Sequence, residues 1–79
     1  MDDDGLQAAL LEAHGTGDHL QLVHLYTQAA DAREASGDIN ATCFFLTHAY
    51  VFALEQGAEE AVALNKRLAD YGRAELISF

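Results

Sequence analysis

The chain of 79 residues has no proline, a single cysteine, four basic residues and no long apolar run. Because the chain has no proline, no such residue interrupts a helix between one connecting turn and the next. One cysteine excludes a disulfide framework within the chain and favours a reducing compartment. The length allows one domain, so any function has to fit on one small core.

The scarcity of basic side chains makes the chain strongly acidic. Thirteen aspartate and glutamate residues stand against four lysine and arginine residues, which gives a formal net charge of −9. Such a surface repels the phosphates of nucleic acids and of anionic lipid head groups. We therefore expect neither nucleic acid nor a membrane surface as a partner.

Membrane and export segments are also missing from the sequence. The start, Met1-Asp2-Asp3-Asp4, lacks the basic residues and the apolar core of a signal peptide. No apolar run approaches the roughly 20 residues that a membrane-spanning helix needs. The sequence predicts a cytoplasmic protein with a single helical domain, residues 1–79, which has an acidic N-terminal end at 1–4 and an apolar C-terminal tail at 73–79.

Glycines divide the chain at intervals of twenty residues, at Gly17, Gly37 and Gly57. A glycine just past a periodic run is a common left-handed helix cap, and the aspartates that follow it at Asp18 and Asp38 can cap the next helix. The spacing predicts helices at about residues 4–14, 18–36, 38–56 and 58–71, with residues 15–17 as a flexible connection. The fold class is therefore all-α, an antiparallel array of four helices whose first helix is short.

Each predicted helix has an apolar face with a helical period. The third has the widest face and should be the central helix, with Phe45 and Phe52 largely buried, so that Phe45→Ala should cost about 3–5 kcal/mol. The predicted core faces are Leu6, Leu10 and Ala13; Leu22, Val23, Leu25, Tyr26, Ala29 and Ala30; Ile39, Ala41, Cys43, Phe45, Leu46, Ala49, Tyr50, Phe52, Ala53 and Leu54; and Ala61, Val62, Leu64, Leu68, Ala69 and Tyr71.

A narrow strip of the third helix is polar except for Phe44 and Val51, which lie seven residues apart. Exposed apolar side chains on a polar face indicate an interaction site, because the other helices of so short a chain do not cover them. The C-terminal tail is also too apolar to be well solvated. The candidate interaction surface comprises Asn40, Phe44, Thr47, His48 and Val51 on the strip, together with Leu76, Ile77 and Phe79 in the tail.

Over residues 22–72 the spacing resembles tetratricopeptide helix hairpins, in which a unit of two helices recurs about every 34 residues. With Gly37 between the two helices of one unit, Tyr26 falls at an aromatic position and Ala29 and Ala30 fall at positions of close packing. The next glycine of this kind, Gly72, follows 35 residues later. The resemblance implies a hairpin architecture and carries over no ligand.

The sequence departs from the tetratricopeptide pattern at several positions. Arg33 replaces an aromatic residue, Thr42 an alanine and Leu54 a proline, and a single full repeat stands between two halves. For this reason the resemblance assigns no peptide-binding role to any residue.

No pattern in the sequence indicates catalysis or a cofactor. The histidines His14, His19, His24 and His48 include no pair spaced three or four apart, so we expect solvent-facing or capping roles and no metal site. Cys43 lies within an apolar run and should be a buried, inert thiol. The chain also lacks the Asp-Ser pair of acyl carrier proteins.

We therefore predict no catalytic residue, no cofactor and no metal. The favoured function is a non-enzymatic protein-interaction module, with a protein as its partner. The alternative is a small structural or regulatory subunit that mainly associates with itself as a homodimer, through the strip that holds Phe44 and Val51.

Overall fold

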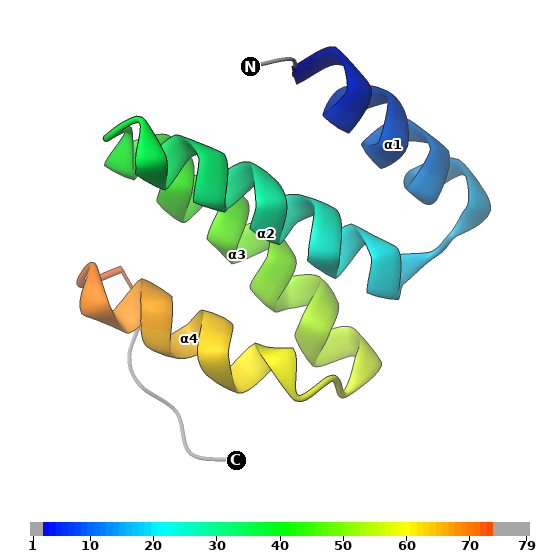
Figure 1. The fold of residues 1–79 in the computed structure, drawn as a ribbon. Coiled ribbons are helices and arrows are strands. Elements are labelled where there is room, and N and C mark those ends of the chain that lie inside the picture. The colour runs from blue at the N-terminus through cyan, green and yellow to red at the C-terminus, as the bar shows by residue number, and fades with distance from the viewer. Residues whose placement is uncertain (1–2, 74–79) are drawn as a thin grey trace.

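The computed structural model describes residues 3–73, which form four α-helices joined by short turns (Figure 1). The helices are α1 (Asp3–Thr16), α2 (His19–Ala35), α3 (Ile39–Gln56) and α4 (Glu60–Asp70). Each helix turns back along the one before it, so the predicted all-α array is confirmed. The candidate residues Leu76, Ile77 and Phe79 lie outside the described residues.

All four described helices end at a glycine with a positive φ angle. After α2, Gly37 has a φ of 81° and the N–H of the next residue donates to the carbonyl of Arg33 at 3.0 Å. After α3, Gly57 has a φ of 62° and the N–H of Ala58 donates to the carbonyl of Ala53 at 2.9 Å. These bonds satisfy carbonyls that lack a partner within the helix, as the glycine spacing predicts.

The two predicted aspartate caps are present as well. The side chain of Asp18 accepts a hydrogen bond from the N–H of Gln21 at 3.2 Å, and that of Asp38 accepts one from the N–H of Ala41 at 3.1 Å. The helix α4 lacks such a cap, because Glu59 at its start makes no side-chain capping bond. This helix accordingly begins later than predicted.

The predicted lengths of the first and last helices are wrong. The helix α1 has 14 residues and includes Gly15 and Thr16, which we expected in a flexible connection. The Thr16 hydroxyl donates to the carbonyls of Glu12 and Ala13 at 3.1 and 3.3 Å, which holds it in the last turn. The shortest helix is α4, with 11 residues.

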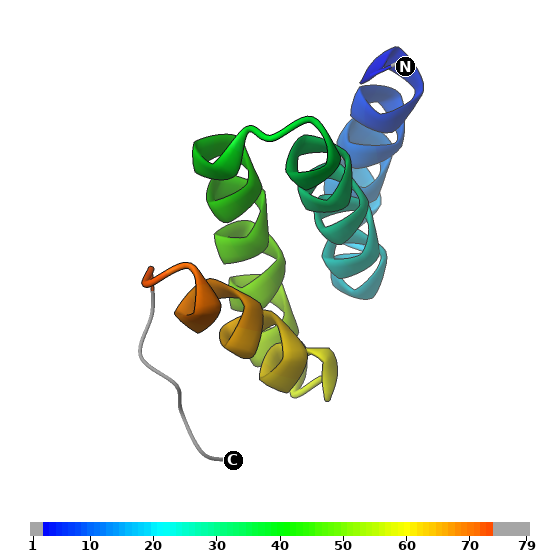
Figure 2. The same ribbon diagram turned by 60° about the vertical axis from the view of Figure 1, so that its left-hand side comes forward.

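The hairpin of α2 and α3 lies at the centre of the array. The helix α1 packs on α2 and α4 packs on α3, so the two outer helices lie at opposite edges (Figures 1 and 2). Small side chains at the contacts let the helix backbones approach closely. The fully buried core residues include Leu22, Ala30, Leu46, Ala49 and Ala53.

The predicted faces of α3 and α4 need correction at their margins. Phe45 and Phe52 are only partly buried and pack against the edge of the core. Ile39, Leu54 and Val62, all assigned to core faces, are 38%, 42% and 50% exposed. Wheel angles locate a side chain on its helix but do not say which neighbouring helix covers it.

Asn65 was left out of the predicted faces and is buried. It lies on the same side of α4 as the buried residues Ala61, Leu64 and Leu68. Ala61 precedes it by four residues and Leu68 follows it by three, and residues with this spacing share one helix face. Within residues 3–73 no helix is long and apolar enough to cross a membrane.

Candidate protein-interaction surface

The predicted strip residues of α3 come together on the side of the helix that faces solvent. Phe44 is 57% exposed and Val51 is 46% exposed, whereas Leu46, about half a turn away around the helix, is fully buried. Residues three or four apart share one helix face, so these positions form a continuous surface. We call this surface the outer strip, and it comprises Asn40, Phe44, Thr47, His48, Val51 and Glu55.

Neighbouring side chains hold Phe44 in place on the outer strip. Its ring centroid lies 4.5 Å from that of His48 and 5.3 Å from that of Phe45, with the two phenylalanine rings edge to face. The Nδ1 atom of His48 lies 2.9 Å from the carbonyl oxygen of Phe44. Because a carbonyl only accepts, Nδ1 carries the proton and donates. Phe44 is thus an exposed aromatic side chain with a fixed support.

Charged side chains lie at both ends of the outer strip. At the start of α3, the Nη2 atom of Arg73 donates to Oδ1 of Asn40 at 2.7 Å. At the other end, Glu55 is exposed and Glu59 begins the next helix. The C-terminal end of the α3 helix dipole adds partial negative charge there. The strip therefore has the Arg73 cation and the Asp38 carboxylate that caps α3 at one end, an apolar middle and carboxylates at the other end.

The exposed apolar surface continues from α3 onto α4. Leu54 and Val62 line an apolar hollow of about 270 Å³ at the α3–α4 turn, together with Ala53, Gly57, Ala58, Glu59 and Ala61. This extension was not predicted, because the apolar periodicity of the sequence places both Leu54 and Val62 on core faces. Leu54 follows Val51 by three residues, a spacing that already places it beside the strip. No comparable signal exists for Val62.

A second cluster surrounds Tyr26 between α1, α2 and α3. Its ring centroid lies 5.1 Å from that of His48 and 5.9 Å from that of Phe52, and its hydroxyl lies 3.0 Å from Nε2 of His14. The ring centroid of His19 lies 5.4 Å from that of Phe52. His19 and His48 are thus partly buried against aromatic rings, which corrects the expectation that they only face solvent or cap helices.

The described residues include no group of three or more histidine, cysteine, aspartate or glutamate side chains placed to hold a metal ion. Cys43 is buried, as predicted. The rings of the Tyr26 cluster pack α1, α2 and α3 against one another at the edge of the core.

Polar side chains join α2 to α4. The Nη2 atom of Arg67 lies 2.9 Å from Asp31 and 3.4 Å from Glu34, and the Tyr71 hydroxyl donates to Glu34. That hydrogen bond raises the pKa of Tyr71, since ionising the phenol would place two negative charges together.

At the other end of this contact, His24 lies 3.3 Å from Glu60. The Glu60 pKa is lowered, first by a hydrogen bond from its own backbone N–H and then by the hydrogen bond with His24. These pairs are exposed, so they add little stability and chiefly fix how α4 lies against α2.

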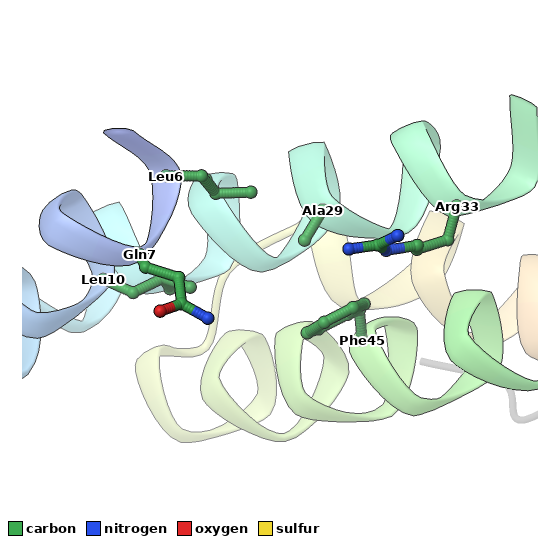
Figure 3. Close-up of a pocket in the computed structure, with 6 residues that line it drawn as sticks. All are labelled: Leu6, Gln7, Leu10, Ala29, Arg33 and Phe45. Carbon is green, nitrogen blue, oxygen red and sulfur yellow. The ribbon is translucent and has the colours of Figure 1, made fainter. Parts of the chain in front are cut away.

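A small cleft opens between α1, α2 and α3 (Figure 3). Its volume of about 90 Å³ is below the roughly 150 Å³ of a cavity that holds benzene, and far below the roughly 300 Å³ of an ordinary ligand pocket. We therefore assign it no ligand. The lining residues are Leu6, Gln7 and Leu10 from α1, Ala29 and Arg33 from α2, and Phe45 from α3.

No protein-family model matches the chain, and neither a curated protein nor a solved structure matches it.

Proposed function

We propose that the chain is a non-enzymatic protein-interaction module of the helix-hairpin type and that the outer strip of α3 is its binding surface. The observation that carries this proposal is the exposure of Phe44 and Val51 opposite a fully buried face of the same helix. A large apolar side chain left in water forgoes about 1.5–3 kcal/mol of burial, which a protein partner can recover.

The composition of the strip is that of a small protein interface. Aromatic residues, including phenylalanine, are enriched at the centres of protein interfaces, and here Phe44 packs against His48. Asn40, Thr47 and Glu55 surround the apolar centre and can form the polar rim. Leu54 and Val62 enlarge the apolar area at one end.

The packing of α2 against α3 supports a tetratricopeptide-like hairpin as the scaffold. Ala29, Ala30 and Ala49 are buried where the two helices approach, and Tyr26 packs at the edge of the same contact. We infer that the module acts in the cytoplasm, where the single buried thiol of Cys43 needs no partner.

Site-specific photo-crosslinking in cells that express the chain tests the proposal. A photoreactive amino acid at Thr47, in the middle of the outer strip, should give a covalent adduct with a protein. The same group at Gln28, an exposed position of α2, is the matched control and should give none.

The second arm of the experiment adds Phe44→Glu to the chain that carries the crosslinker at Thr47. Placing a charge at the apolar centre should abolish the adduct, because the charge must be desolvated on binding. A Thr47 crosslinker that yields no protein adduct, or equal adducts from positions 47 and 28, contradicts the proposed function.

A further inference from the structure

The outer strip is symmetric about the midpoint between Thr47 and His48. Phe44 and Val51 lie equally far along the chain from this midpoint, and so do Asn40 and Glu55. A two-fold axis through the midpoint, perpendicular to α3, would place the same patch of both copies in one contact, as a two-fold dimer requires. It sets the phenylalanine of one copy against the valine of the other.

The charges at the ends of the strip select the direction of this pairing. Arg73, bound to Asn40, supplies the positive end, where the Asp38 carboxylate also caps α3, and the exposed Glu55 lies at the negative end. Antiparallel α3 helices bring each positive end to the partner's negative end, whereas parallel helices bring like charges together.

We propose that the protein bound by the outer strip is a second copy of this chain. The two α3 helices pack antiparallel about a two-fold axis between Thr47 and His48, and Arg73 pairs with the partner's Glu55. This inference rests on the proposed function and names its partner.

The net charge of −9 on each copy opposes the approach but does not prevent it. At about 0.15 M salt the screening length is roughly 8 Å, so charges away from the contact repel weakly. Within the strip itself, Arg73 and Glu55 offset one another. A contact along one helix is smaller than the roughly 800 Å² per partner of a standard interface, so we expect a weak dimer.

Sedimentation of the full chain tests the proposal, from about 10 to about 500 µM, the range of a weak interface. The wild-type chain should shift from monomer to dimer. The charge reversals Arg73→Glu and Glu55→Arg should each weaken the dimer by about tenfold or more, because each places two like-charged pairs at the contact.

Mixing the two reversed variants is the decisive measurement. In a mixed dimer, Glu at position 73 of one chain meets Arg at position 55 of the other, and the second pair is the native one. The mixture should therefore dimerise with an affinity near that of the wild type, as should the double variant. Lys66→Glu and Glu12→Arg make the same charge changes at exposed positions of α4 and α1 and should leave the dimer intact.

The outcomes separate this inference from the proposed function. A wild-type chain that stays monomeric, while a Thr47 crosslinker captures a different protein, overturns the self-pairing and leaves the interaction module standing. If the wild-type chain dimerises but the mixture of Arg73→Glu and Glu55→Arg does not, the antiparallel register is wrong. A Thr47 crosslink to residues 74–79 of the same chain, with the mass of one chain, overturns both proposals.

Discussion

The two faces of α3 differ in the size of their side chains. The inner face carries Thr42, Cys43, Ala49 and Ala53, with Leu46 as its only large apolar residue, and all of these are buried. The rings of α3 lie at its margins or on its outer face. Within residues 3–73 no aromatic side chain belongs to the buried core.

This difference shows that the core is set by how closely the helices approach. Small residues on the inner face allow α2 and α4 to lie against α3, and a ring at those positions would force them apart. The exposure of Phe44 on the outer face is therefore not explained by a lack of space in the core. The ring of Phe44 is more than half exposed, so we expect it to contribute little to the stability of the fold.

The largest expected effect comes from the inner face. Leu46→Ala removes a fully buried side chain and should lower the free energy of unfolding by about 2–5 kcal/mol, through lost burial and the cavity left behind. The matched outer substitution, Phe44→Ala, should change it by only about 0.5 kcal/mol. Urea denaturation at low micromolar concentration measures both, and equal losses would remove the distinction between the faces.

A margin position should give an intermediate effect. Phe45 packs against the core from its edge, so we expect Phe45→Ala to cost about 2 kcal/mol, less than the 3–5 kcal/mol expected for a largely buried ring. The same denaturation series tests the order of the three substitutions. A loss for Phe45→Ala above that for Leu46→Ala would place the centre of the core on the α1 side of α3.

The N-terminal cap stabilises the whole of α3 and not one of its faces. Removing the cap should therefore lower the free energy of unfolding by less than removing a buried side chain. Asp38→Ala removes the acceptor for the N–H of Ala41 and should cost about 1 kcal/mol. Asp38→Asn is the matched control, because asparagine caps about as well as aspartate. If Asp38→Asn lowers the free energy of unfolding as much as Asp38→Ala does, the negative charge of Asp38 matters more than its capping hydrogen bond.

Local signals explain why the helices and their ends could be predicted. Each junction is set by residues adjacent in sequence, such as Gly37 followed by Asp38, and the structure places them as expected. The length of α4 escaped prediction because Glu59 looks like a helix residue in sequence but makes no capping bond. The predicted face of α2 agrees with the structure, in which Leu22, Val23, Leu25, Ala29 and Ala30 are buried and Tyr26 packs at the edge of the core.

The candidate surface was only partly predictable. Phe44 and Val51 were found because polar residues surround them on one helix. The charge at the start of the strip was not found, since Arg73 lies 33 residues from Asn40 and meets it only because α4 ends beside the start of α3. The exposure of Val62 likewise depends on which helices pack together.

The smallest expected effect lies outside both faces of α3, in the contact between α4 and α2. The Tyr71 hydroxyl donates to the Glu34 carboxylate, which raises the pKa of Tyr71 above its ordinary value of about 10. A group with a raised folded-state pKa stabilises the fold fully below its unfolded pKa. That contribution is lost as the pH rises through the folded-state pKa, here above about 10.

Absorbance titration of the phenolates measures this contact directly. The difference between the wild type and Tyr71→Phe should isolate a tyrosine that ionises later than an ordinary one. Glu34→Gln should bring that midpoint back toward the ordinary value, because the amide carries no negative charge to oppose ionisation. Stability above about pH 10 should then fall less steeply in Tyr71→Phe than in the wild type. If Tyr71 ionises at the ordinary pH in the wild type, the hydroxyl is not bound to Glu34 in solution, and this polar contact between α2 and α4 is absent there.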